Sequence, residues 1–275
     1  ILFNNINFLL RIITAILGSF LLAVSILNPW TYFVIFLAIL LSCLIEFYFI
    51  LEKNNYRPFA PLGLLFGTFL FVISFSISAQ IIPSIYYNSL LIIFPFICIL
   101  ILYYKNLSDA LINLSLSFSG IIYIALPFSL LNLIAFDSGV YDYTFIAGIL
   151  LYTWVSESAS YIGGTIFGKT KLSSISPNKT WEGVLFGLVS NVILSFVLSH
   201  YFVKYSLLFC LFFGLIVLTV GIFGDLFESL VKRGFNLKDS SNKLPGHGGY
   251  LDRFDSLLFI IPNIYFYLLF VKHLT

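Results

Sequence analysis

The chain has 275 residues, of which 60% are hydrophobic, 19% aromatic and only 9% charged, with a net charge of +2. Soluble domains average about 25% charged residues, because their surfaces must be wetted, so this composition excludes a water-soluble globular protein. We therefore expect an integral membrane protein that is surrounded by membrane lipids, and we expect no nucleic-acid partner.

Apolar stretches long enough to cross a bilayer recur along the chain. A helix needs about 20 mostly apolar residues to cross the hydrocarbon core. The pattern predicts an all-α polytopic helical bundle with about nine transmembrane helices. In chain order, the predicted spans are residues 7–27, 29–50, 59–79, 88–104, 110–134, 141–156, 183–203, 205–225 and 256–272.

The basic residues predict an orientation for this bundle. In the nine-span arrangement most of them fall in connections on one side, near which Arg11 also lies, and Lys204 and Lys272 fall opposite. The positive-inside rule makes the crowded side cytoplasmic, with the N-terminus inside and the C-terminus outside. The residues on the crowded side are Lys53, Arg57, Lys105, Lys169, Lys171, Lys179, Lys232, Arg233, Lys238, Lys243 and Arg253.

The two parts of the chain differ in polarity. Residues 1–150 form apolar spans with short connections, and residues 151–275 add two polar loops on the predicted cytoplasmic side. We expect the chemistry in the second part. Glu46 is an acidic exception in the first part, and its position near a helix end fits either a functional group or a side chain that reaches the interface.

The first polar segment covers residues 154–183 and combines glycines with three lysines, Lys169, Lys171 and Lys179. Glycine permits close approach of a backbone, and lysine supplies a point charge for phosphate. An ordinary basic loop that contacts anionic headgroups has the same composition, and this alternative stays open.

The second polar segment covers residues 224–256 and carries acidic residues at two predicted helix ends. If the eighth span continues as a helix beyond Asp225, then Glu228 and Lys232 share its face. Asp252 and Asp255 lie one turn apart at the start of the last span. Carboxylates at two helix ends, joined by a glycine-rich turn, suit magnesium, which takes one or two carboxylates plus substrate phosphates. Interfacial salt bridges and helix capping are the alternative, and the role of His247 stays open.

Residues Ser229 to Asp255, which read S-L-V-K-R-x4-K-D-x5-P-G-H-G-G-x-L-D-R-x-D, resemble the signature of phosphatidate cytidylyltransferases, also called CDP-diacylglycerol synthases. Tyr161, Gly163, Phe167-Gly168-Lys169 and the stretch from Ser176 to Gly183 resemble that family's other recurrent segment. The resemblance covers about 100 residues of the C-terminal part. It implies a bacterial inner-membrane enzyme that converts CTP and phosphatidic acid to CDP-diacylglycerol and pyrophosphate.

The resemblance also implies roles for individual residues, magnesium as cofactor and a homodimer. A second metal or a monovalent cation is an open addition. The implied metal ligands are Asp225, Asp252 and Asp255. The implied catalytic residues are Asp225, Lys232, Arg233, His247, Asp252 and Arg253. The implied substrate-binding residues are Ser176, Lys179, Glu182, Lys238, Asp239, Gly248 and Gly249.

One position departs from the family pattern, because Glu157 stands where an aspartate is usual, which puts a direct metal contact there in doubt. CDP-archaeol synthases and polyprenol kinases are the nearest alternatives, and the P-G-H-G-G-x-L-D-R stretch favours the cytidylyltransferase. An ion-coupled transporter would place acidic residues near mid-membrane. Here they gather beside cations at the predicted cytoplasmic edge, as a phosphate site requires.

Overall fold

The computed structural model describes residues 2–92, 95, 107–201, 205–241, 243–244 and 248–274. These residues are mostly helical and form no β-strand. Two isolated β-bridges pair Lys171 with Thr180 and Leu244 with Gly248. The predicted all-α architecture is confirmed.

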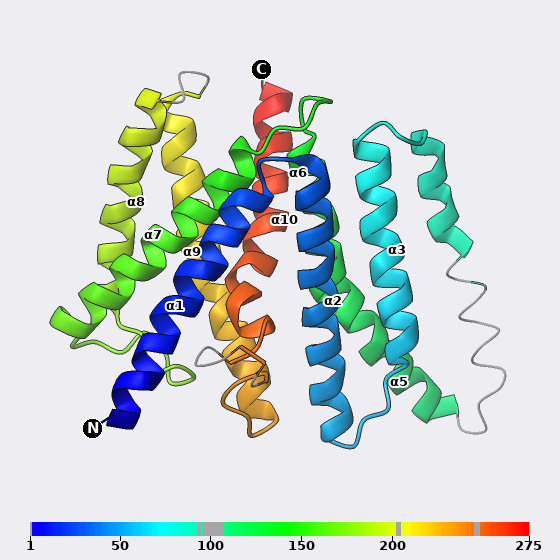
Figure 1. The fold of residues 1–275 in the computed structure, drawn as a ribbon, viewed down its shortest axis with the longest axis horizontal. Helices are drawn as coiled ribbons and strands as arrows, with labels where there is room; N and C mark the ends of the chain where they lie inside the picture. The colour runs from blue at the N-terminus through cyan, green and yellow to red at the C-terminus, as the bar shows by residue number, and fades with distance from the viewer. Residues whose placement is uncertain are drawn as a thin grey trace. The chain divides into compact units, whose positions relative to one another are not determined.

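The helices follow the chain in a simple order (Figure 1). They are α1 (Leu2–Ser25), α2 (Pro29–Lys53), α3 (Ala60–Ser78), the 3-10 helix η1 (Ser84–Ile92), α5 (Leu107–Gly120), the π-helix η2 (Ile121–Ala125), α6 (Leu126–Ala135), α7 (Thr144–Phe167), α8 (Trp181–Tyr201), α9 (Leu207–Gly234) and α10 (Leu251–Leu274).

Six described helical segments are long and apolar enough to cross a membrane. They are Pro29–Lys53, Ala60–Ser78, Leu107–Ala135, Trp181–His200, Leu207–Gly234 and Leu251–Leu274. Each corresponds to a predicted span. The predicted span 7–27 corresponds to α1, which contributes the shorter apolar stretch Ile13–Ser25. The chain is a polytopic membrane protein.

Two of the predicted spans meet a different structure. Residues 88–104 fall on η1 and on a stretch that lies largely outside the described residues. The predicted span 141–156 corresponds to α7, but this helix continues to Phe167. The polar residues after 156 lower its hydropathy without ending the helix, so α7 is not among the six most apolar segments. The loop expected after residue 156 therefore begins only after Phe167.

The chain divides into two compact units. The first unit contains residues 1–143 and 239–253, and the second contains residues 144–238 and 254–275. A functional division at residues 150 and 151 remains a prediction.

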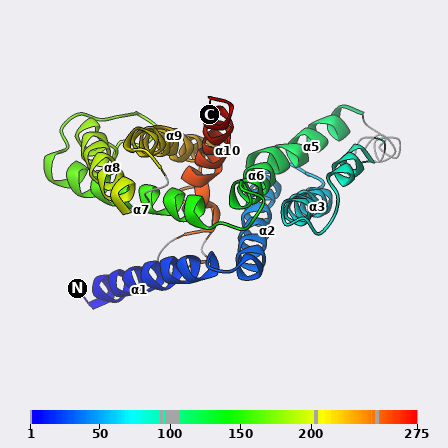
Figure 2. The same ribbon diagram turned by 90° about the horizontal axis from the view of Figure 1, so that it is seen from above.

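Buried polar side chains join the helices of the first unit, where α2, α3, α5, η2 and α6 pack together (Figure 2). Asn132 on α6 is fully buried; its amide donates to Phe71 O and Ser74 Oγ, and its oxygen accepts from Tyr32 Oη at 2.9 Å. Buried polar groups are costly unless they are hydrogen-bonded, so this satisfied set fixes α2, α3 and α6 relative to one another.

In the second unit α7, α8 and α9 lie side by side (Figures 1 and 2). Tyr152 on α7 donates to the Cys210 carbonyl of α9 at 3.1 Å and also pairs with Ser195 Oγ of α8 at 2.9 Å. Asn191 of α8 donates to the Gly214 carbonyl of α9 at 2.9 Å. These bonds hold the three helices together.

Candidate active site

A cavity of about 630 Å³ lies within the second unit and is lined by both polar and apolar side chains. Among its polar lining residues are Glu157 of α7, Ser176 and Lys179 of the segment before α8, and Asp225 of α9. Its apolar lining residues include Val217, Leu218, Ile222 and Ile260. Binding sites for small molecules occupy about 300–1,000 Å³ and are mostly apolar with a few polar groups, so this cavity has the size and the character of a substrate site.

Lys179 and Asp225 meet in this cavity. The Lys179 ammonium group forms an ion pair with Asp225 Oδ2, and the two side chains are 25% and 36% exposed. Ser229 Oγ lies one turn further along α9 and donates to Asp225 Oδ1 at 3.3 Å. Two predicted site residues, which are 46 positions apart in sequence, are therefore brought together, and both remain partly accessible to a ligand.

The Asp255 carboxylate lies close enough to other charged side chains to interact with them electrostatically. Asp255 on α10 is 8% exposed, and its Oδ1 accepts from the backbone N–H of Ser256 at 2.7 Å. It interacts unfavourably with the charges of Asp225 and Glu157, and favourably with that of Lys232. The charges of Asp225 and Glu157 repel that of the buried Asp255, and a cation bound beside them would relieve this repulsion.

The carboxylates of this cavity have the charge that a magnesium ligand needs, but they do not form a complete set of ligands on their own. Across the described ranges, no group of three His, Cys, Asp or Glu side chains is close enough to hold a metal by itself. Magnesium needs only one or two protein carboxylates plus phosphates and water. In this structure the cationic partner of the Asp225 carboxylate is the Lys179 ammonium group.

The end of α9 positions two of the predicted phosphate-binding cations differently from Lys179. Lys232 forms an ion pair with Glu228, one turn earlier, and their side chains are 13% and 2% exposed. The guanidinium group of Arg233 donates to the Leu237 carbonyl at 3.1 Å. The helix continues past Asp225 to Gly234, as the sequence analysis supposed, so Glu228 and Lys232 lie on one face.

A closed loop carries Lys179 into the cavity. The Glu182 carboxylate, in the first turn of α8, accepts from the backbone N–H groups of Lys169 and Thr170 at 3.1 Å and from Thr170 Oγ1 at 2.5 Å. Across the loop, Leu172 N donates to the Lys179 carbonyl at 2.8 Å. Glu182, a predicted substrate-binding residue, thus fastens the two ends of the loop in this structure.

The remaining predicted residues belong to the first unit, except Lys238, which is exposed in the second. Asp239 and Arg253 are exposed, and His247 lies outside the described residues. Asp252, in the first turn of α10, accepts from Ser240 N at 2.9 Å and from Gly249 N at 2.8 Å. The Asp252 carboxylate therefore binds backbone N–H groups of both Ser240 and Gly249.

Both predicted glycines of the segment before α10 stand at positions where a side chain would not fit. Gly248 has φ +82°, and a Cβ atom added there would lie 2.6 Å from Asp252 Oδ2. At Gly249 an added Cβ would lie 2.0 Å from Ser240 Oγ and 2.4 Å from Glu46 Oε2. A positive φ and such close approaches favour glycine over any residue with a side chain.

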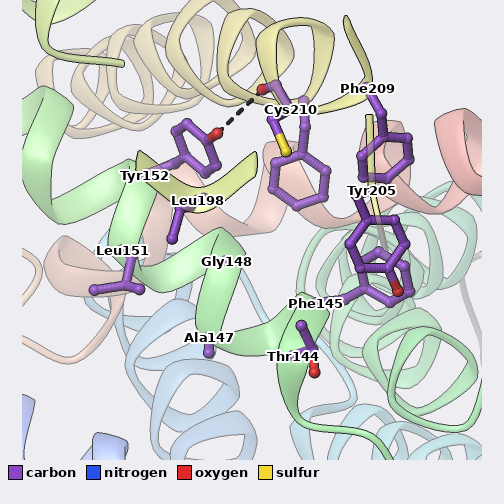
Figure 3. A pocket seen from close by; sticks show the side chains of 11 residues that line it. Thr144, Phe145, Ala147, Gly148, Leu151, Tyr152, Leu198, Tyr205, Phe209 and Cys210 are labelled. Carbon is purple, nitrogen blue, oxygen red and sulfur yellow. Dashed lines mark hydrogen bonds between the residues drawn. The ribbon is translucent and has the colours of Figure 1, made fainter. Parts of the chain in front are cut away.

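A second, apolar pocket of about 50 Å³ lies between α7, α8 and α9 (Figure 3). Figure 3 shows Tyr152 with its hydrogen bond to the Cys210 carbonyl on one side of the pocket, and the rings of Phe145, Tyr205 and Phe209 grouped on the other side. This pocket is too small for a nucleotide and has no acidic or basic side chain among its lining residues. The larger cavity is therefore the candidate active site.

The larger cavity also includes lining residues that the sequence analysis did not assign, among them Ser156, Ser160, Asn178 and Thr180. Ser156 and Ser160 lie four residues apart on α7, as do Glu157 and Tyr161. Residues at this spacing share one helix face. Polar residues repeated every three or four positions could therefore have indicated from the sequence that this face of α7 lines a site.

The chain is similar to known proteins. The chain matches the model of the cytidylyltransferase family over residues 9–271. It is 45% identical over 105 residues to "Phosphatidate cytidylyltransferase 4, chloroplastic" of Arabidopsis thaliana, covering 38% of this chain and 27% of that one. It is 39% identical over 129 residues to the phosphatidate cytidylyltransferase of Haemophilus influenzae, covering 45% of each chain. For the Bacillus subtilis protein of the same name the identity is 42% over 132 residues, covering 46% of this chain and 48% of that one. The chain thus spans half the length or less of these curated relatives.

Proposed function

The chain belongs to the cytidylyltransferase family, and on that premise we propose that it is a phosphatidate cytidylyltransferase. In this proposal it is a membrane-bound nucleotidyltransferase that converts CTP and phosphatidic acid to CDP-diacylglycerol and pyrophosphate. The names of the relatives from Haemophilus influenzae and Bacillus subtilis support this reaction.

One observation carries the proposal, namely that charged and apolar side chains line the same cavity of the second unit. Lys179 and Ser176 are among the polar lining residues and offer donors to phosphate oxygens. Val217, Leu218 and Ile260 are among the apolar lining residues and suit hydrocarbon. A lipid phosphate needs both kinds of lining residue at once, whereas a soluble nucleotide alone would need only the polar ones.

The proposed chemistry forms one P–O bond and breaks another. A phosphate oxygen of the lipid attacks the α-phosphorus of CTP, and the bond from that phosphorus to the bridging oxygen of the β-phosphate breaks as pyrophosphate leaves. Lys179 would neutralise charge that develops on the phosphate oxygens, because fixed positive groups stabilise such transition states. Asp225, paired with Lys179, would orient that ammonium group toward the substrate.

Magnesium is part of this proposal, and Asp225 would hold it within the second unit. The bound ion would neutralise phosphate charge and polarise the reacting phosphorus. Two sets of roles remain predictions. They are metal binding by Asp252 and Asp255, and phosphate contacts by Lys232, Arg233, Lys238 and Arg253. The substrate-binding roles of five further residues also remain predictions; these residues are Ser176, Glu182, Asp239, Gly248 and Gly249.

The proposal extends to location and assembly. We place the protein in a bacterial inner membrane, with its N-terminus and its polar loops in the cytoplasm, where CTP is available. The asymmetric distribution of Lys and Arg supports this orientation. A homodimer is expected from the family resemblance.

The experiment is a reconstituted assay of the purified protein with CTP, magnesium and a panel of lipid acceptors. Phosphatidic acid, an ether-linked archaeal lipid phosphate and a polyprenol are compared at equal surface concentration. We expect CDP-diacylglycerol and equimolar pyrophosphate from phosphatidic acid, and at least tenfold slower turnover of the other two, a difference of about 1.4 kcal/mol. Turnover of the polyprenol with no nucleotide transfer would contradict the proposal.

A further inference from the structure

Glu46 is a buried acidic residue within a membrane-spanning helix, and the proposed reaction does not use it. It lies on α2 and is 1% exposed. Burying a carboxylate costs free energy unless it is paired and hydrogen-bonded, and ionisable residues inside membrane helices are usually functional. Its partners therefore indicate what it does.

Within the described part of the chain, Glu46 contacts residues that precede and begin α10. Oε2 accepts from Ser240 Oγ at 3.1 Å and from the backbone N–H of Leu251 at 3.0 Å. Oε1 accepts from Ser241 Oγ at 2.8 Å and lies 3.9 Å from Lys243 Nζ. One carboxylate thus binds both ends of the glycine-rich segment, across separations of 194 to 205 residues.

The same segment carries Asp252, and Ser240 links the two carboxylates. The Ser240 hydroxyl donates to Glu46, while its backbone N–H donates to Asp252 at 2.9 Å. Gly249 lies between them, because its N–H donates to Asp252 and its Cα faces Glu46 Oε2 too closely for a side chain. The orientation of Asp252 therefore depends on a segment that Glu46 holds from the other side.

We propose that Glu46 is a positioning residue: it fixes Ser240, Ser241 and Leu251 to α2 and so holds Asp252 and the glycine pair in the geometry that turnover requires. This inference rests on the proposed function, because Asp252 is a predicted metal ligand and Gly248 and Gly249 are predicted to bind substrate. Glu46 itself does not touch the reacting atoms. A carboxylate that supports a reactive group from behind affects the rate chiefly through orientation.

The test compares Glu46→Gln with Glu52→Gln, which makes the same change on an exposed residue of the same helix. Glutamine keeps the size of the side chain but removes its charge and turns an N–H₂ group toward hydroxyl and N–H donors. We expect kcat to fall about 10- to 100-fold in Glu46→Gln, with the KM for CTP changed by less than about threefold. Glu52→Gln should match the parent.

Hydrogen exchange gives a second readout that does not depend on activity. In Glu46→Gln the amides of Ser240, Gly249 and Leu251 should exchange at least about tenfold faster, while amides of α8 and α9 stay as protected as in the parent. Ser241→Ala removes one donor and should give a smaller change in the same direction. Combined with Glu46→Gln it should add less than its separate effect, because the two residues share one bond.

Parent-like kcat and parent-like exchange in Glu46→Gln would overturn the inference. Faster exchange throughout the chain together with a raised KM would also overturn it, because Glu46 would then support the fold in general. If Glu46→Gln does not fold, the Ser241→Ala variant alone tests the inference. Unchanged hydrogen exchange at Leu251 together with unchanged kcat in Ser241→Ala would then overturn it. An inactive but folded parent would count against the proposed function, and the exchange data would still decide whether Glu46 anchors the segment.

Discussion

The ammonium group of Lys179 is ion-paired with the carboxylate of Asp225. The lysine comes from the loop before α8 and the aspartate from α9, so this contact joins the two polar segments inside the cavity of the second unit. Because both side chains are partly exposed, the pair contributes little to folding, and its importance should lie in binding and catalysis.

The first prediction concerns this pair. Lys179→Gln should lower kcat/KM for CTP about 100-fold, because it removes a positive charge from the developing phosphate charge. Its thermal midpoint should stay within about 2–4 °C of the parent, since an exposed ion pair is worth about 0–1 kcal/mol. Steady-state kinetics and thermal unfolding in detergent measure both values. Lys53→Gln, at the exposed end of α2, is the matched control. Unchanged kcat/KM in Lys179→Gln would count against the site.

The second prediction concerns the buried carboxylate of Asp255. Asp255→Asn removes a negative charge that faces Asp225 and Glu157. The variant should be more stable than the parent, with a thermal midpoint about 2–4 °C higher if the repulsion costs about 1 kcal/mol. Turnover should nevertheless fall, because active sites retain destabilising charges for function. A less stable variant with parent-like turnover would show that Asp255 serves the fold alone.

The third prediction uses two glycines with opposite surroundings. Gly249→Ala places a methyl group against Ser240 Oγ and Glu46 Oε2 and should destabilise the protein by about 1–3 kcal/mol. Gly234→Ala, at the end of α9, meets nothing within 4 Å and should leave stability equal or slightly higher. Thermal unfolding of both variants measures the difference. Equal midpoints would mean that segment 239–251 is not closely packed against Glu46.

The fourth prediction concerns the loop that carries Lys179. Glu182→Ala removes the acceptor for the N–H groups of Lys169 and Thr170 and for the Thr170 hydroxyl. The loop should open more often, so trypsin should cleave after Lys169 and Lys171 faster than in the parent. Glu182→Gln keeps one acceptor oxygen and should show an intermediate rate. Cleavage of Glu182→Ala at the parent rate would contradict the fastening role.

The apolar spans and the continuation of α9 past Asp225 could be predicted from sequence, because hydropathy and helical spacing are local properties. The extent of α7 was missed, because its polar residues Ser156, Glu157 and Ser160 read as a loop. In the structure they face a cavity while the helix continues to Phe167.

The partners of Glu46 could not be predicted. They lie 194 to 205 residues away, and no local pattern encodes a contact at that separation. The ion pair between Lys232 and Glu228 could be predicted from their spacing of four residues on α9. The family resemblance assigned Lys232 to phosphate instead, and that role remains to be tested.

The most direct test of the central claim is the fate of two radiolabels from CTP in the presence of phosphatidic acid. Label at the α-phosphate should appear in the lipid product, and label at the γ-phosphate should appear only in pyrophosphate. Transfer of the γ-label to lipid would instead show a lipid kinase, and it would contradict the assignment of this cavity to nucleotidyl transfer.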